Sequence, residues 1–223
     1  MDRHNVLYEA ELREHLEQKL AWKMLGLPLK QSSPTHKLTI SSDLICFGGV
    51  RIRVQDIQGI RYGIFQVYHS GVRGEESYAI DLTDGRESIN IECARRAGKG
   101  RLWKKDRAKV QDHYQNIVGI LFELVQLPLL REMVKKFDGG LDVYVSNLAL
   151  NEIGISEDKK ARILRWEDYW GYIIDGGYIH IFPRNGTKRA FRHFYRLSMR
   201  DDWNAVCLKY LLDYIKKQYG FGV

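Results

Sequence analysis

Cysteine and long apolar runs are scarce in this chain, and each scarcity excludes a class of protein. Its three cysteines, Cys46, Cys93 and Cys207, are an odd number at wide spacing, which argues against a disulfide framework and indicates a reducing compartment. The most apolar segment, 117–130, contains polar residues and a proline and falls short of the roughly 20 residues that a membrane-spanning helix needs. The sequence therefore predicts neither a disulfide-stabilised secreted fold nor a transmembrane helix.

The motifs of the common catalytic and metal sites are also missing. The sequence contains no His-Glu-x-x-His, Cys-x-x-Cys, Gly-x-Ser-x-Gly or P-loop pattern, and its seven histidines never stand at metal-ligand spacing. We therefore expect no metal, no cofactor and no enzymatic activity. Glu167, Asp168 and Asp175 leave one alternative, a carboxylate site, although an aspartate at the start of a strand more often bonds backbone amides in a turn.

What the chain has in excess is positive charge. Its 223 residues include 35 Lys and Arg against 28 Asp and Glu, a formal net charge of +7. This balance favours anionic partners, namely nucleic acid, acidic lipid or acidic protein, without choosing among them. With 44% hydrophobic residues the chain can bury a sizeable core, and its length suits one large domain or two small ones.

The first half combines a helix-like segment with strand-like runs. Residues 5–25 are rich in helix formers, with leucines at four-residue steps, and predict a helix. After a linker at 30–36, short β-branched and aromatic runs predict strands, and glycine-containing dipeptides predict tight turns between antiparallel neighbours. The predicted strands cover 38–40, 44–47, 50–54, 59–68, 78–82 and 88–92, with turns at 48–49 and 84–85.

A long amphipathic helix separates this half from a second run of strands. Apolar residues recur at three- and four-residue steps after Asp106, the expected N-cap, and Pro128 is expected to kink this helix or to begin another. Glycines at 139–140 mark the predicted domain boundary, and Asp201 or Asp202 is expected to cap a closing helix. The predicted strands of the second half cover 141–145, 148–155, 162–166, 169–174, 178–182 and 189–195, with turns at 175–176 and 185–186.

One passage recurs in both halves and carries a family resemblance. Val54-Gln55-Asp56 and Trp166-Glu167-Asp168 each follow several strands and lead into another, which predicts an internal repeat. The segment at Trp166 and the helix entry at 200–205 resemble the PH-like domains of uncharacterised bacterial proteins, which often occur in tandem. The resemblance covers about residues 38–220, although the first half lacks the tryptophan.

The resemblance implies an architecture and an absence of catalysis. It implies an α+β protein in which an N-terminal helix precedes two PH-like antiparallel β-barrel or sandwich modules, each closed by a C-terminal helix. The expected domains are the N-terminal helix at 1–30, the first module at 36–138 and the second at 139–223. A scaffold of this kind implies no catalytic site.

The densest charge lies between the last strand of the first half and its helix. Eight cations surround one aspartate within residues 95–109, on a stretch that contains glycines, so they would create a positive field that attracts phosphates or acidic headgroups. The alternative is a solvated loop that keeps a basic protein in solution. The residues predicted to bind an anionic partner here are Arg95, Arg96, Lys99, Arg101, Lys104, Lys105 and Arg107.

A second basic stretch interleaves cations with aromatic rings. As a strand it would place Arg192, Phe194 and Arg196 on one face, a combination of charge and stacking ring that nucleic-acid-binding sheets use. The alternative is the exposed edge of an ordinary barrel. The residues predicted to bind an anionic partner here are Arg184, Lys188, Arg189, Arg192 and Arg196.

Aromatic residues also crowd one strand of the second half. Alternation places Trp170 on the same face as Trp166 and Tyr172, opposite Tyr169. We expect these rings to fill the core, because a buried aromatic side chain contributes a large apolar area. Trp170 is the ring that would anchor a partner if it reaches the surface.

Together the patterns favour a noncatalytic PH-like scaffold in the cytoplasm, or peripherally at a membrane, that binds a protein partner or an acidic membrane surface through its basic loops. The alternative is a nucleic-acid-binding protein that uses residues 95–109, for which binding would fall steeply with salt. A third hypothesis is an enzyme with carboxylates in a cleft between the domains, for which a deep acidic pocket would be needed.

The first basic segment yields a direct test. Replacing Arg95, Arg96, Lys104 and Lys105 by Ser should abolish recruitment to acidic targets, because the positive field disappears. The free energy of unfolding should change by less than about 1 kcal/mol, as expected of exposed sites. Co-sedimentation and thermal unfolding measure the two effects, and unchanged recruitment would remove the functional case for this segment.

Overall fold

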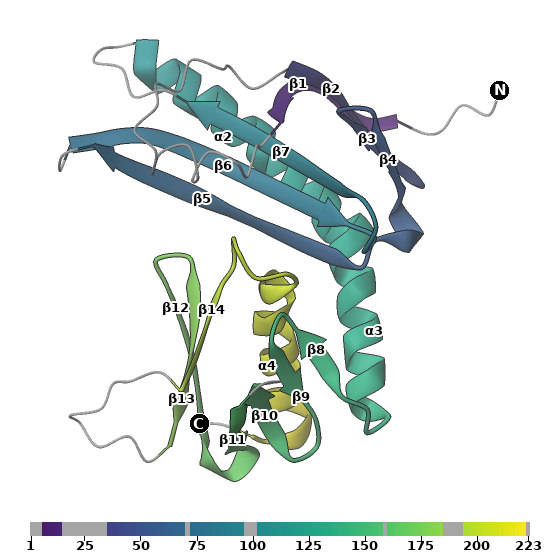
Figure 1. Cartoon of the computed structure of the whole chain (residues 1–223), viewed down its shortest axis with the longest axis vertical. Helices are drawn as coiled ribbons and strands as arrows, with labels where there is room; N and C mark the ends of the chain where they lie inside the picture. Colours follow the sequence, from purple (N-terminus) through teal and green to yellow (C-terminus); the bar gives the residue numbers. More distant parts are fainter. Residues whose placement is uncertain are drawn as a thin grey trace. The chain divides into compact units, whose positions relative to one another are not determined.

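The computed structural model describes residues 6–14, 35–69, 72–95, 102–157, 160–184 and 194–221, which form antiparallel sheets and three α-helices (Figure 1). The chain folds as two compact units, residues 1–125 and 126–223. In the described ranges the first unit holds one sheet of seven strands, and the second holds two sheets of four and three strands.

The first unit consists of two antiparallel meanders joined into one sheet. Its elements are β1 (Val6–Glu14), β2 (Thr35–Ser41), β3 (Leu44–Phe47), β4 (Val50–Arg53), the 3₁₀ turn η1 (Val54–Asp56), β5 (Gly59–His69), β6 (Val72–Thr83), β7 (Ser88–Arg95) and α2 (Leu102–Leu121). β1 pairs with β7, which gives the strand order β4-β3-β2-β1-β7-β6-β5. The helix α2 lies along β6 and β7, where the rings of Tyr114 and Tyr78 are 5.1 Å apart.

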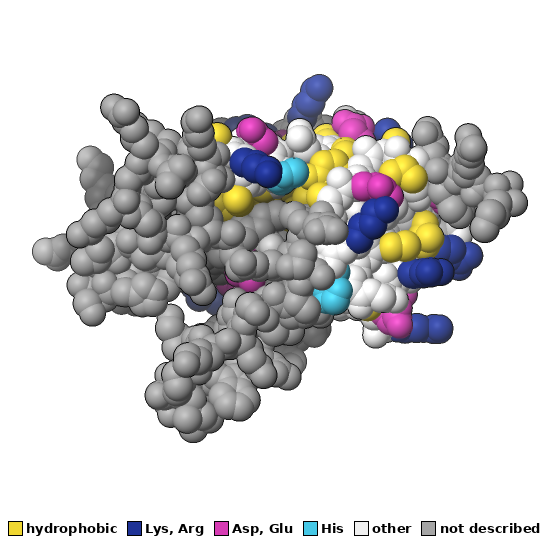
Figure 2. All heavy atoms as spheres, turned by 90° about the horizontal axis from the view of Figure 1, so that it is seen from above, with side chains coloured by type: hydrophobic (Ala, Val, Ile, Leu, Met, Phe, Trp, Pro, Cys, Tyr) yellow, Lys and Arg dark blue, Asp and Glu magenta, His cyan; other side chains and the backbone are white. Residues whose placement is uncertain are grey.

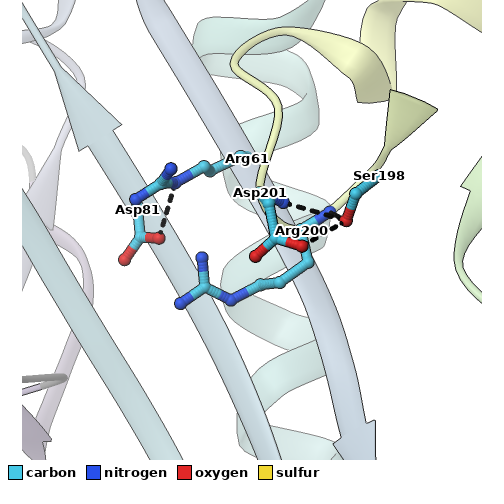
Figure 3. Close-up of polar contacts among 5 residues, drawn as sticks. All are labelled: Arg61, Asp81, Ser198, Arg200 and Asp201. Atoms are coloured by element: carbon cyan, nitrogen blue, oxygen red, sulfur yellow. Dashed lines mark hydrogen bonds and ion pairs between the residues drawn. The ribbon is translucent and has the colours of Figure 1, made fainter. Parts of the chain in front are cut away.

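The core of the first unit follows the strand period of two. Alternate aliphatic residues of β2 to β7 are buried and meet Ile117 and Leu121 of α2. Two carboxylates, Asp81 and Glu92, are buried as well. Asp81 on β6 is fully buried and accepts a hydrogen bond from Arg61 Nε, 2.9 Å away on the neighbouring strand β5 (Figure 3). The Arg61 guanidinium compensates the buried charge of this carboxylate.

The second unit begins within a continuous helical segment and contains two separate meanders. The segment runs from α2 through the π-helical turn η2 (Phe122–Gln126) into α3 (Leu127–Asp138), with Pro128 in the first turn of α3, as the sequence predicts for one of its two alternatives. The remaining elements are β8 (Val143–Val145), β9 (Leu148–Leu150), β10 (Gly154–Glu157), β11 (Lys160–Arg165), the 3₁₀ turn η3 (Trp166–Asp168), β12 (Tyr169–Asp175), β13 (Tyr178–Pro183), β14 (Tyr195–Ser198) and α4 (Ala205–Tyr219).

Aromatic side chains pack around the buried Trp166 in the second unit. Trp166 is 3% exposed, its ring stacks on Phe221 at 5.5 Å, and its Nε1 donates to the carbonyl of Asn151 over 2.7 Å. Phe137 of α3 and Tyr169 of β12 meet the same indole edge-on. Trp166 therefore joins α3, the start of β12 and the residues after α4 in one aromatic cluster.

The prediction of an N-terminal helix is wrong. Residues 6–14 form the strand β1, which pairs with β2 along its length and with β7 near its end. Tyr8 Oη of this strand lies 2.6 Å from Nδ1 of His113 on α2, in a hydrogen bond. Tertiary pairing thus overrides the helix propensity of this segment, which is a weak preference per residue. Most of the predicted helix, residues 15–25, lies outside the described residues.

The prediction of two β-barrels is also wrong for the described residues. In the first unit the outer strands β4 and β5 do not pair with each other, and in the second unit β11 and β12 belong to different sheets. In both units a 3₁₀ turn separates the fourth strand from the fifth. This turn is η1 in the first unit and η3 in the second. Each unit instead runs through four strands, a 3₁₀ turn, three strands and a helix.

Neither predicted helix cap is formed. Asp106 lies inside α2, and Asn204, in the left-handed region at φ 62°, precedes α4 without a side-chain cap. The carboxylates of Asp201 and Asp202 serve the turn before the helix. Asp201 accepts from the hydroxyl of Ser198 over 2.7 Å (Figure 3), and Asp202 accepts from the backbone N–H of Ser198 over 2.7 Å. Local turn bonding therefore competes with capping for these side chains.

The backbone of Gly154 lies so close to the backbone of β11 that a side chain does not fit between them. This predicts the effect of adding one methyl group. A Cβ at Gly154 would clash with the carbonyl oxygen of Leu164, so Gly154→Ala should displace β11 and lower the free energy of unfolding by about 1–3 kcal/mol. The matched control is Gly171→Ala on β12, where a Cβ meets nothing within 4 Å. Urea denaturation of both variants checks this, and equal stabilities would contradict it.

Asp138 joins α3 to α4 and predicts a change in a tyrosine titration. Its carboxylate accepts hydrogen bonds from Tyr214 Oη (2.7 Å) and Tyr219 Oη (2.9 Å), and the bond raises the pKa of Tyr214 from 10 to about 12. Because folding raises this pKa, the stability that the bond contributes is complete below pH 10 and is lost as the pH rises through about 12. Asp138→Asn should return the pKa of Tyr214 toward 10, as read by NMR of ¹³C-labelled tyrosine, whereas an unshifted titration would contradict the assignment.

Candidate functional site

The first basic segment is only partly described. Arg95 ends β7, and Lys104, Lys105 and Arg107 lie in the first turns of α2. Arg96, Lys99 and Arg101 lie outside the described residues. On the described part of the face in Figure 2, Lys and Arg side chains lie among Asp, Glu and apolar side chains rather than in a patch of one sign. The anionic-partner role of residues 95–109 stays a prediction.

The second basic segment connects two strands of one sheet. Arg184 follows β13, is exposed, and donates its backbone N–H to the carbonyl of Asp168. Arg196 is exposed on β14, between the buried Tyr195 and Leu197, so strand alternation holds at this position. Lys188, Arg189 and Arg192 lie outside the described residues.

Trp170 is on the surface, but it does not share a face with Trp166. The side chain of Trp170 is 42% exposed, whereas Trp166 belongs to η3 and is buried. The predicted alternation fails because η3 interrupts the strand and because the register shifts between Tyr169 and Gly171. Tyr172 points to the other side, where its hydroxyl donates to Asp213 of α4 over 2.6 Å. Burial raises the pKa of Tyr172, and the Asp213 bond adds to this.

The three-stranded sheet β12-β13-β14 brings Trp170 and Arg196 to one side. On β13 the buried Ile179 and Ile181 fix the pleat, so that the residues between them point away from the core. The register places Ile173 of β12 and Arg196 of β14 on either side of His180. We call this side the aromatic face, and its members are Trp170, Ile173, Tyr178, His180, Phe182 and Arg196.

The rings of the aromatic face form an unbroken series. Trp170 meets Phe182 edge-on at 6.2 Å, Phe182 stacks with His180 at 6.4 Å, and His180 meets Tyr178 at 6.1 Å between centroids. At the far end Arg196 places its guanidinium carbon 3.6 Å from the centre of the Tyr178 ring. A flat cation and four rings thus line one side of a sheet, where each supplies polarisable surface.

The β13–β14 hairpin, which contributes three of these rings, contains Lys and Arg residues but no acidic residue. From residue 176 to residue 200 the sequence contains no Asp or Glu, and this stretch includes the whole of β13, β14 and the connection between them. Its cations are Arg184, Lys188, Arg189, Arg192, Arg196 and Arg200. Asp175, opposite Tyr178 at the end of β12, is the nearest carboxylate in the register.

Gly171 leaves an open position at the Phe182 end of the aromatic face, on the edge strand β12. It is directly opposite Phe182, and a Cβ built on it would meet no atom within 4 Å. A larger residue here would stand beside the Phe182 ring. The backbone at Gly171 is therefore open to an approaching group beside the Phe182 ring.

Other chemistry is not assembled in the described ranges. Asp168 and Asp175 stand at opposite ends of β12, so the structure does not bring this pair of the carboxylate hypothesis together. No three His, Cys, Asp or Glu side chains there are grouped as a metal ion would require. None of the described helices is long and apolar enough to cross a bilayer.

The series Tyr178, His180 and Phe182 was missed by sequence reasoning. The signal is present, because Tyr-Ile-His-Ile-Phe alternates aromatic and aliphatic residues with a period of two. Both kinds of residue are apolar or amphipathic, so the pattern alone does not say which set is inside. The pairing of β13 with β12 and β14 decides it, by burying the isoleucines.

Comparison with known proteins does not assign the chain to a family. The PH-like resemblance at Trp166 has no relative to test it and stays a prediction. No family model, curated protein or solved structure matches this chain.

Proposed function

We propose that this protein is a noncatalytic binding protein that holds an anionic partner on the aromatic face of its second unit. The rings supply contact area, and Arg196 and Arg184 supply charge at the β14 side and at the end of β13. Rings and guanidinium groups bind partners without reacting with them. The proposed location is the cytoplasm, in keeping with Cys46 and Cys207, which are both free.

One observation carries the proposal, the continuous ring series that ends in Arg196. Trp170 is exposed and the other three rings are half-buried. Tryptophan, tyrosine and arginine are the residues that most often dominate binding energies. Trp170 and Ile173, 42% and 43% exposed, flank the open position at Gly171. The anchor predicted from the sequence, Trp170, is therefore retained, in a setting of rings that the sequence did not indicate.

Charge supports an anionic partner over a neutral one. The β13–β14 hairpin has no carboxylate, so it contains no acidic group that would offset its cations. An approaching anion would gain from this field before it touches the rings. The basic segment 95–109 is a second proposed contact, which the quadruple serine variant tests separately.

A photoreactive residue tests whether the aromatic face is occupied in the cell. Replacing Ile173 by p-benzoylphenylalanine should give a covalent adduct on irradiation of the cells that make the protein. The matched control is the same substitution at Ile163, an isoleucine of β11 in the same unit that is 53% exposed. Denaturing electrophoresis separates adducts from the free chain.

We expect adducts from position 173 and few from position 163. Adding Trp170→Ala to the position-173 variant should remove most of them, since the anchor is lost, while the unfolding midpoint stays close to that of the parent. Equal yields at the two positions, or none at position 173, would overturn the proposed function.

A further inference from the structure

We infer that the anionic partner of the aromatic face is a single-stranded nucleic acid, whose bases stack on the rings and whose phosphates meet Arg184 and Arg196. This inference rests on the proposed function, since it concerns the same face. It differs from the nucleic-acid hypothesis drawn from the sequence, which used residues 95–109. Three features of the face point to this partner.

The first feature is the order of the rings. Tyr178, His180 and Phe182 alternate along β13, so neighbouring rings stand about 7 Å apart along the strand. Their centroid distances of 6.1 Å and 6.4 Å agree with that spacing. Successive flat groups of a linear ligand can therefore each meet their own ring. Base–aromatic stacking tolerates any base sequence, because every base has a π face.

The second feature is where the cations are. The guanidinium carbon of Arg196 lies 3.6 Å from the centre of the Tyr178 ring, an arrangement in which charge and stacking act on the same ligand. Arg162 on β11 has its guanidinium carbon 3.8 Å from the centre of the Phe194 ring, just before β14. Cation–ring pairs therefore occur on β14 itself and just before it.

The third feature is the open position at Gly171. A duplex keeps its bases stacked on one another and offers its phosphates outward, so it has no free base for this position. A single strand can turn a base into it, beside Phe182 and Trp170. An acidic protein or an acidic membrane would be attracted by the charge of the hairpin, but the open position beside the Phe182 ring would add no specific contact to its binding.

Binding of fluorescein-labelled 12-nucleotide DNA and RNA of mixed sequence, measured by anisotropy with the full chain, tests the inference. The comparison ligands are the corresponding duplex, heparin, which is a polyanion without bases, and vesicles that contain acidic lipid. We expect the single strands to bind more tightly than the duplex. Unlabelled heparin should displace them poorly at equal charge. The relative affinities of DNA and RNA show which of the two the face prefers.

Variants separate stacking from charge. Phe182→Leu and Gly171→Val should each weaken single-strand binding about ten-fold, by removing a ring and by filling the open position. Arg196→Gln should lower the slope of log affinity against log salt by roughly 0.7, the value for one phosphate contact on a single strand. The matched controls, Tyr144→Leu on β8 and Arg165→Gln on β11, are exposed residues of the other sheet and should leave binding unchanged.

Each outcome decides the inference. Single-strand binding that falls with Phe182→Leu and Gly171→Val, in variants whose unfolding midpoint is retained, supports it. Binding that heparin or the duplex matches, or that ignores both substitutions, reduces the face to a charged surface and overturns it. Binding to acidic vesicles that depends on the same rings overturns it as well.

The adducts at position 173 distinguish a failure of the nucleic-acid inference from a failure of the proposed function. If they form but resist nuclease and no oligonucleotide binds, the nucleic-acid inference fails and the proposed function stands. If neither adduct nor oligonucleotide binding is found, both fail.

Discussion

Inward burial of two isoleucines is the constraint on which the aromatic face depends. Side chains alternate along a strand, and Ile179 and Ile181 point into the core of the second unit. Tyr178, His180 and Phe182 must therefore point to the opposite side of the sheet. The rings are thus presented by packing that takes place behind them. A change in the inner residues would act on the face through register rather than through contact, since a slip by one residue exchanges the two sides.

The neighbouring strands bring the remaining members of the aromatic face to the same side of the sheet. The register of β12 and β14 sets Ile173 and Arg196 beside His180, and the shift between Tyr169 and Gly171 returns Trp170 to the same side. Without that irregularity, strict alternation would set Trp170 and Gly171 on opposite sides of the sheet. A local defect of pairing therefore adds the largest ring to the series, at the end where Phe182 lies.

Local signals predicted much of the fold, and long-range pairing accounts for what they missed. The strands β3, β5, β12 and β13 and the glycine turns that follow β3, β6 and β12 are predicted by β-branched runs and by the need for positive φ angles, which are properties of a few adjacent residues. The segment 6–14 could not be placed this way, because its pairing partners are about 30 and 80 residues away. For the candidate site, Trp170 and Arg196 were found by type, whereas their joint position on one side required the pairing of three strands.

The join between β1 and β7 gives the first unit a seam. Among the described residues only Arg13–Glu92 and Glu14–Ile91 pair across it, so the strand pairing between the two meanders is limited to two residue pairs. Should that seam open before either meander melts, β7 would offer a bare hydrogen-bonding edge to any extended chain nearby. An exchange of first strands between two molecules would then close both edges again, which makes strand swapping the natural misassembly of this architecture.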